Sequence, residues 1–304
     1  MTVTETRSIA AEPTQAPSFT QSFPAAGLDA LVPGEVARKA ETVGVTKAGM
    51  ERLDVFVLSV LAGAFIAMGA IFATTVAAGG TELPYGVVRL LAGSVFTLGL
   101  ILVVVAGAEL FTGNNLIVMA WASRRVSTAR VLENWTVVWV GNFVGAVSTA
   151  VLMYVSKQYE FGGGAVGQAA LSIADAKTSL GFVQAIALGM LCNALVCLAV
   201  WLTYGARTTT DKILAVIPPI AAFVAAGFEH SVANMYFISI GLLVKRDEAF
   251  VESLDPAPDL SNLTWQSFFA DNLLPVTIGN IVGGAVMVGA VYWFVYLRHR
   301  PQEP

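Results

Sequence analysis

The sequence predicts an all-α integral membrane protein with six transmembrane helices, arranged as two inverted halves of three helices each. Three observations lead to this prediction. Hydrophobic residues form 56% of the chain and charged residues only 12%, which is about half of their share in soluble domains. Six apolar stretches are each long enough to cross a bilayer, which takes about 20 residues. Two sequence motifs also occur in both halves of the chain in the same order.

The residues that precede the first span are expected to have two parts. The first has many Pro, Ala, Ser and Thr residues and no apolar core of a signal peptide, so it is expected to be disordered. A short helix is then expected over residues 33–48, because Pro33 suits the first turn of a helix, and it is interpreted as an interfacial or pore-capping helix. The expected organisation is a disordered tail over 1–27, an amphipathic N-terminal helix within 28–52, a six-span domain over 53–298 and a tail over 299–304.

The apolar stretches define the spans directly. In chain order they are 54–78, 85–106 with a shorter continuation over 114–122, 135–156, 182–204, 213–243 with a break, and 273–297. The second and fifth spans carry polar residues in the middle of apolar sequence, which predicts that these two helices are broken. The acidic, proline-containing segment 245–272 is expected to be a solvated loop.

The distribution of basic residues predicts the orientation. An even number of spans places both termini on one side of the membrane. The N-terminal segment, the loops 123–133 and 205–212 and the C-terminal tail hold 12 of the 17 lysines and arginines, and the opposite side holds 5. Because positive charge accumulates in cytoplasmic segments, both termini are expected in the cytoplasm.

Several classes of function are disfavoured. The net charge is −4 and no basic tract is dense, so nucleic acid is not an expected partner. Cys192 and Cys197 lie five residues apart in an apolar run, which is neither a disulfide framework nor a metal-ligand spacing. No Gly-x-Ser-x-Gly segment occurs, and Glu229-His230 lacks the second histidine of a zinc-binding helix. Neither enzymatic activity nor a metal or other cofactor is therefore expected.

An internal repeat relates the two halves. The pattern Gly-x-Glu-x-x-x-small-Asn occurs at 107–114 and again at 227–234. The pattern Gly-Asn-x-x-Gly occurs at 141–145 and at 279–283, in both cases seven residues after another asparagine. Because each half holds three spans, the second half enters the membrane from the opposite side, as in many channels and transporters. This arrangement places both Glu-containing motifs near the middle of the membrane.

Each of these motifs brings a carboxylate into a span. Placing a carboxylate at the centre of a span costs about 2.5–3.5 kcal/mol of insertion free energy, so the carboxylate is expected to bind a partner there. One interpretation is structural, in which Glu109 and Glu229 accept hydrogen bonds from backbone N–H groups freed at the helix breaks. The other makes them ligands of a cation. The symmetry favours a helix-break scaffold, which consists of Glu109, Asn114, Glu229 and Asn234.

The two halves differ at one position that carries chemistry. The second motif has His230 where the first has Leu110. A side chain that titrates near neutral pH inside a membrane is a functional candidate. Thr112 lies in the first break, where its hydroxyl could bond His230 or a permeating anion. Broken helices also direct positively polarised N-termini toward the break, which suits an anion.

At these residues the chain resembles the formate–nitrite transporter family, and within it most closely the pentameric formate channels. The similarity extends from about residue 28 to residue 297. It is carried by the segments Gly107–Thr112, Asn134-Trp135, Gly141-Asn142, Cys197–Trp201, Gly227–Asn234 and Asp271–Asn280.

The resemblance implies an aquaporin-like protomer with its own pore, a homopentamer, and a place in the inner membrane of a bacterium. It implies that Thr112 in the span-two break faces the central His230. It also implies that Asn193 is a polar partner near this site and that Lys177 attracts anions. The hydrophobic constrictions that it implies are formed by Phe96, Leu100, Leu110, Phe111, Val196 and Phe223.

The function that follows from the resemblance is transport of formate and related small monovalent anions, with proton coupling through His230 as one option. The expected partners are such an anion, protons and the lipid bilayer. Nitrite, hydrosulfide, lactate or acetate as the main substrate remain open alternatives. A channel for neutral solutes is a further alternative, although the Asn-Pro-Ala signature of that class is absent.

Overall fold

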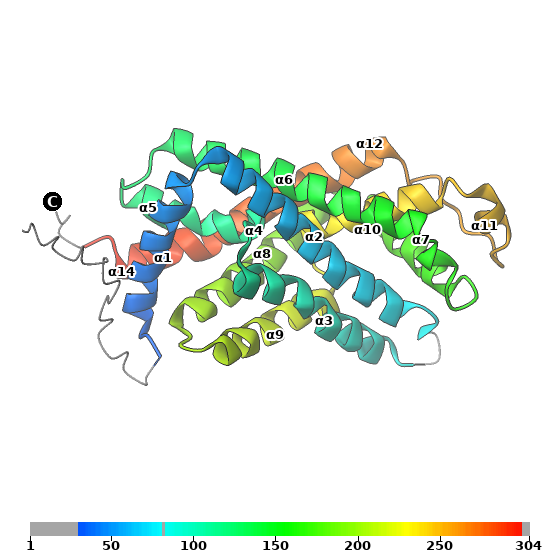
Figure 1. Ribbon diagram of the computed structural model, residues 1–304, viewed down its shortest axis with the longest axis horizontal. Helices are drawn as coiled ribbons and strands as arrows, with labels where there is room; N and C mark the ends of the chain where they lie inside the picture. Colours follow the sequence, from blue (N-terminus) through cyan, green and yellow to red (C-terminus); the bar gives the residue numbers. More distant parts are fainter. Residues whose placement is uncertain (1–29, 81–82, 300–304) are drawn as a thin grey trace, which may run out of the picture.

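The computed structural model describes residues 30–80 and 83–299 of the chain. The predicted N-terminal tail 1–27 and nearly all of the predicted C-terminal tail therefore lie outside the described residues. Regular structure in the described residues is helical throughout (Figure 1). Helices α1, α5 and α14 lie at one end of the molecule and α7 and α11 at the other, and these ends are called here the α1 end and the α7 end (Figure 1).

The first half contains two long unbroken helices and one broken span. The elements are α1 Pro33–Gly49, α2 Arg52–Ala77, α3 Tyr85–Leu102, the π-helical η2 Val103–Gly107, α4 Phe111–Asn114, the 3-10 turn η3 Asn115–Ile117, α5 Val118–Ala122 and α6 Thr128–Val155.

The second half repeats this order of elements, and its spans run in the opposite direction across the membrane. The elements are the 3-10 turn η4 Gln158–Glu160, α7 Ala165–Thr178, α8 Phe182–Gly205, α9 Thr209–Ala226, α10 Ser231–Val244, α11 Glu248–Glu252, α12 Trp265–Ser267, the π-helical η5 Phe268–Leu273, α13 Leu274–Ile281, the π-helical η6 Val282–Ala290 and α14 Val291–Tyr296.

Six helical segments of the described residues are long and apolar enough to cross a membrane. The sixth runs from Trp265 to Tyr296, so the prediction of a loop over 245–272 was wrong for its last residues. The third begins at Thr128 rather than at residue 135. In both cases a hydroxyl caps the helix ahead of the apolar run: Thr264 accepts from the N–H of Ser267, and Ser127 from that of Arg130.

The second and fifth spans are broken at the predicted motifs. Helix α3 continues through η2 to Gly107, whose φ is +86°, and α9 ends before Gly227, whose φ is +78°. Glycine adopts this left-handed conformation without the steric penalty that other residues meet. The next residues are extended, with Leu110 at φ −106° and His230 at φ −111°, and a new helix starts after each of them. The two breaks therefore have the same form.

Small residues allow the spans of each half to cross closely. A Cβ atom at Gly145 of α6 would overlap the carbonyl oxygen of Val60 in α2. The matching position of the second half, Gly283, would overlap the carbonyl oxygen of Met190 in α8 in the same way. Such contacts through small residues are a main source of helix association in a bilayer.

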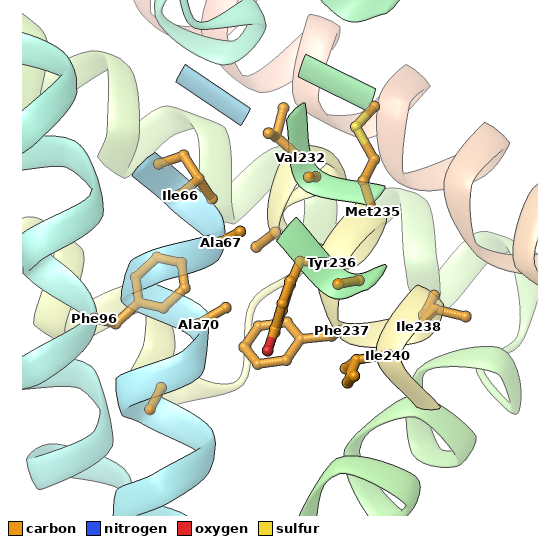
Figure 2. Packing of buried hydrophobic residues seen from close by; sticks show 14 of the residues in the cluster. Ile66, Ala67, Ala70, Phe96, Val232, Met235, Tyr236, Phe237, Ile238 and Ile240 are labelled. Carbon is orange, nitrogen blue, oxygen red and sulfur yellow. The ribbon is translucent and has the colours of Figure 1, made fainter. Parts of the chain in front are cut away.

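Apolar side chains fill the space between the two halves. Figure 2 shows Ala67 and Ala70 of α2 and Phe96 of α3 facing the aromatic residues Tyr236 and Phe237 of α10. The rings of Phe96 and Phe237 stack with their centroids 6.4 Å apart. This packing fixes α10, whose first residue follows the second break, against the helices of the first half.

A polar contact outside the membrane spans stabilises the α7 end. The hydroxyl of Tyr159 donates to Oδ2 of Asp247 at 2.6 Å, and its ring packs edge-to-face on Phe250 of α11. This hydrogen bond holds the pKa of the Asp247 carboxyl below its usual value and raises the pKa of Tyr159. Asp247 is therefore charged at neutral pH and anchors the segment that follows α10.

Candidate substrate pathway

One asparagine ties the first break to its neighbours. The Oδ1 atom of Asn142 in α6 accepts the backbone N–H of Phe111 at 2.9 Å. Its Nδ2 donates to the carbonyl oxygens of Ser59 in α2 at 2.7 Å and of Glu109 at 2.9 Å. Asn142 is fully buried. It therefore pairs backbone groups at the break that would otherwise be left without partners inside the protein.

Asn280 of α13 does the same for the second break. Its Oδ1 accepts the N–H of Ser231 at 2.9 Å, and its Nδ2 donates to the carbonyl oxygens of Gly189 at 2.9 Å and Glu229 at 3.0 Å. The prediction that the two glutamates would accept the freed backbone N–H groups was therefore wrong. An amide side chain can accept and donate together, so it pairs an N–H and two carbonyls, whereas a carboxylate can only accept.

The carboxylate of the first break binds a lysine from outside the spans. Nζ of Lys47 in α1 donates to Oε1 of Glu109 at 2.6 Å, and Nδ2 of Asn114 donates to Oε2 at 2.7 Å. Asn134 completes the group, because its Oδ1 accepts from Asn114 at 2.9 Å and its Nδ2 donates to the carbonyl of Lys47 at 3.3 Å.

The carboxylate of the second break has the same set of partners. Nζ of Lys177 in α7 donates to Oε1 of Glu229 at 2.8 Å, and Nδ2 of Asn234 donates to Oε2 at 2.6 Å. Asn272 accepts from Asn234 at 2.8 Å and donates to the carbonyl of Lys177 at 2.8 Å. The repeat thus includes the helices α1 and α7 at the two ends, each of which supplies one lysine.

Sequence reasoning missed Lys47, which it counted only among the basic residues of the N-terminal segment. The internal repeat did not reveal Lys47, because the spacing between lysine and glutamate differs between the halves: Lys47 precedes Glu109 by 62 residues, whereas Lys177 precedes Glu229 by 52. Only the paired contacts reveal that the two lysines are equivalent.

His230 and Thr112, whose counterparts in the other half are the apolar Leu110 and Val232, lie next to each other. Nε2 of His230 lies 3.0 Å from Oγ1 of Thr112, and both residues are buried. Nδ1 of His230 accepts the N–H of Ala233 at 3.1 Å and so caps α10. An accepting Nδ1 carries no proton, which assigns the proton of the neutral ring to Nε2. Nε2–H then donates to Oγ1 of Thr112, which leaves the hydroxyl proton of Thr112 available to another acceptor.

Asn193 of α8 joins the two breaks to each other. Its Nδ2 donates to Oδ1 of Asn115 at 2.8 Å, to the carbonyl of Asn280 at 2.7 Å and to the carbonyl of Thr112 at 3.3 Å. Sγ of Cys197, one turn further along α8, also lies 3.3 Å from the Thr112 carbonyl. The backbone at Thr112 is therefore held from the side of α8.

A cavity of about 380 Å³ leads from the α7 end to His230. Lys177 lies on its wall, with Nζ 5.5 Å from the ring centroid of Phe237. Two of the predicted constriction residues, Phe96 and Phe223, line it near His230 and contact each other edge-to-face at 5.7 Å. The ring of Phe223 also stacks on that of His230 at 5.9 Å. Aromatic rings thus form the cavity wall beside the histidine.

The other predicted constriction residues are buried outside the lining of this cavity. They are Leu100, Leu110, Phe111 and Val196, each 2% exposed. Phe111 packs edge-to-face on Trp135 of α6 at 6.4 Å. The structure therefore brings Phe96, Phe223 and His230 together around one cavity, with Thr112 buried behind His230, and places the remaining four in the apolar packing.

Comparison with known proteins identifies the family. Residues 34–294 match the family described as Formate/nitrite transporter. The formate channel FocA of Escherichia coli K12 is 44% identical over 274 residues, which cover 89% of this chain and 96% of that protein. The chain belongs to the formate/nitrite transporter family.

Other members of the formate/nitrite transporter family have similar sequences and structures. A probable formate transporter of Methanothermobacter thermautotrophicus is 39% identical over 88% of this chain and 97% of its own length. A solved structure described as a pentameric formate channel with formate bound is 43% identical, with a TM-score of 0.77 over 81% of this chain and 98% of that one. A second, an ion channel of this family, is 30% identical with a TM-score of 0.72, over 86% and 98%.

Membership of the formate/nitrite transporter family confirms the fold predicted from the sequence: six spans in an inverted repeat, with an aquaporin-like protomer. Within residues 30–80 and 83–299, no group of three or more His, Cys, Asp or Glu side chains is placed to hold a metal ion.

Proposed function

We propose that this protein conducts formate and related small monovalent anions through a pathway in each protomer, and that it assembles as a homopentamer. The observation that carries the proposal is the buried pair Thr112–His230, placed between the two helix breaks at the inner end of an open cavity. Relatives with 44% and 39% identity are described as a formate channel and a probable formate transporter, and a related structure as a pentamer with formate bound.

The hydrogen-bond directions favour holding formate as an anion. A bare anion crosses a dry passage at high free-energy cost unless donors replace its water. The hydroxyl proton of Thr112 supplies such a donor, because His230 already donates to its oxygen. A proton on Nδ1 of His230 would remove the acceptor that caps α10, so the doubly protonated ring conflicts with the local fold. Proton transfer to formate is the alternative. Formic acid has a pKa on the order of 4, so formate enters as the anion at neutral pH and would need a proton inside the protein to cross as the neutral acid.

The remaining residues have supporting roles in this proposal. Lys177 draws anions into the cavity, and Asn193 positions the Thr112 backbone. Glu109, Asn114, Glu229 and Asn234 form the scaffold of the breaks. Phe96 and Phe223 form the hydrophobic constriction of the cavity, and Leu100, Leu110, Phe111 and Val196 are assigned to the constrictions from the family resemblance alone. The protein is placed in a bacterial inner membrane with both termini in the cytoplasm, because its basic residues are concentrated in the segments on that side.

The test is formate flux into proteoliposomes between pH 5 and pH 7 for the wild type and His230→Asn. An asparagine side chain still offers an oxygen to cap α10, so the variant is expected to fold. We expect formate flux to fall roughly tenfold or more at each pH, because the shorter asparagine side chain does not place a donor at Thr112 where Nε2–H does. His299→Asn changes the histidine outside the pathway and is the matched control. An unchanged rate and pH profile in His230→Asn would exclude this role for His230.

The same vesicles separate the alternative substrates. Nitrite, hydrosulfide, lactate and acetate are compared with formate at equal concentration, and a faster anion replaces formate as the substrate. Glycerol and water permeability test the neutral-solute channel. We infer that the protein is not an enzyme, in line with its relatives, which are described as channels and transporters. Chemical conversion of a transported anion by the purified protein would contradict this inference.

A further inference from the structure

Arg89 lines the same cavity as Lys177 and His230 but belongs to the opposite half of the protein. It lies near the start of α3, and its guanidinium donates to the carbonyl oxygens of Val224 and, at 3.4 Å, Ala225. These carbonyls are at the C-terminal end of α9, directly before the second break. The side chain is only partly buried and therefore remains in contact with the cavity.

Arg89 carries the net positive charge of the described cavity lining. The other two ionised side chains on the wall, Lys177 and Glu229, form an ion pair at 2.8 Å. Beyond a few ångströms, opposite charges this close act on an ion as a dipole and largely cancel. Arg89 is bonded to neutral carbonyls, so its charge is not offset in this way. An anion that enters from the α7 end therefore meets the field of Arg89.

The position of Arg89 also changes the effect of a helix end. The last carbonyls of α9 carry a partial negative charge, which would repel an anion from the cavity wall. The guanidinium binds two of these carbonyls and replaces partial negative charge with a full positive charge. The Arg89 side chain thus makes the C-terminal end of α9 attractive to an anion instead of repulsive.

The internal repeat does not reproduce this feature at the other end of the pathway. Arg89 lies 18 residues before Gly107, and the residue 18 positions before Gly227 is Thr209, which has no charge. The scaffold lysines Lys47 and Lys177 are present in both halves, whereas the cation at this position occurs in one half only. An arginine bound to the carbonyls of a broken helix at this position is therefore a feature of the α7 mouth and not of the equivalent position in the other half.

We propose that Arg89 is a specificity-determining residue that captures small anions at the α7 mouth and delivers them to the Thr112–His230 pair. This proposal rests on the anion transport proposed above. It assigns most of the long-range attraction to Arg89, because the charge of Lys177 is largely offset by its pairing with Glu229.

The first experiment measures formate influx into proteoliposomes as a function of formate concentration and ionic strength. Arg89→Gln keeps hydrogen-bond donors for the α9 carbonyls but removes the charge. We expect its half-saturating formate concentration to rise roughly fivefold, with an unchanged maximal rate and a weaker dependence on salt. Arg89→Lys is expected to stay close to the wild type. Arg246→Gln, which removes an exposed cation beyond α10, is the matched control. Wild-type saturation and salt dependence in Arg89→Gln would overturn the proposal.

A second measurement excludes an effect of misfolding. Arg89→Cys is assayed before and after reaction with thiol reagents that attach a cationic, a neutral or an anionic group; the native Cys192 and Cys197 are fully buried. We expect the cationic group to restore formate capture and the anionic group to weaken it further. Equal effects of all three reagents would contradict the proposal. Absence of anion flux in the wild type would instead contradict the proposed function, so the two failures are distinguishable.

Discussion

Two lysines outside the spans neutralise the two carboxylates inside them. The side chain of Glu109 is 7% exposed and that of Lys47 is 22% exposed, and their charged atoms are 2.6 Å apart. A carboxylate at this depth is costly unless a cation and hydrogen-bond donors surround it. Lys47 therefore links helix α1 to the middle of the second span through one short contact.

Lys47→Met should destabilise the protein by about 3 kcal/mol, because it leaves the carboxylate of Glu109 without its cation. Adding Glu109→Gln should recover most of this loss, since the uncompensated charge is then gone. Unfolding in detergent micelles measures both variants. Lys157→Met, which breaks the exposed pair with Glu160, serves as the control and should change the stability little. Equal losses for Lys47→Met and the double variant would show that the ion pair is not the cause.

At the residue scale, the sequence predicted which side chains stabilise the helix breaks, but it did not predict their hydrogen-bond partners correctly. The repeat identified Glu109 and Glu229, which lie in the breaks, and both Gly-Asn motifs, whose asparagines bind the backbone of the breaks. The assignment of donors failed, because the partners of the glutamates come from α1 and α7 at separations of 62 and 52 residues. A single sequence contains no information that fixes such distant contacts.

At the scale of helices, the two halves pack through the same pair of crossings. Gly145 lies against α2 and Gly283 against α8, in both cases at the carbonyl oxygen of a facing residue. The glycines follow the asparagines of the breaks by three residues in each half. Close crossing and break stabilisation are therefore coupled, because moving α6 away from α2 would also move Asn142.

Gly145→Ala and Gly283→Ala should each destabilise the protein by about 1–3 kcal/mol, because the added methyl group forces the backbones apart. Both should also reduce anion flux, since the asparagine contacts at the breaks would lengthen. Gly49→Ala is the control, because a Cβ there meets no atom within 4 Å. Thermal unfolding and flux assays are run together, and wild-type behaviour of Gly145→Ala would show that the crossing has room to adjust.

The ends of the helices were harder to predict than their cores. Hydropathy located all six spans, but it placed the start of the third at residue 135 instead of Thr128 and that of the sixth at residue 273 instead of Trp265. The first turns of these helices are polar and are fixed by Ser127 and Thr264. Helix α7 was not predicted, because its apolar residues alternate with exposed ones and it is too short to span.

At the scale of the whole molecule, the segments with the most positive charge lie at the α1 end. A protein with both termini in the cytoplasm should give fluorescence from a C-terminal green fluorescent protein and no activity from alkaline phosphatase at the same site. Fusion of the phosphatase after residue 163, between η4 and α7, should be active. Active phosphatase at the C-terminus would reverse the orientation and would place the Arg89 mouth in the cytoplasm.

The inverted architecture could be predicted because it follows from counting: three spans in each half reverse the direction of the second half. The asymmetry of charge along the pathway could not be predicted in this way. It depends on α3 of one half lying beside the end of α9 of the other, so that Arg89 reaches Val224. This contact combines residues separated by 135 positions, and no repeat or spacing in the sequence indicates it.

The separation of scaffold from lining has a consequence for protein engineering. Asn142 and Asn280, with the two Lys–Glu pairs, hold both breaks through groups that do not include the side chains of Phe96 or Phe223, which line the cavity. These two positions can therefore be varied while the frame that presents them stays intact. The protein is a suitable starting point for directed evolution of new selectivities, with mutations concentrated at a few lining positions instead of being distributed over the whole chain.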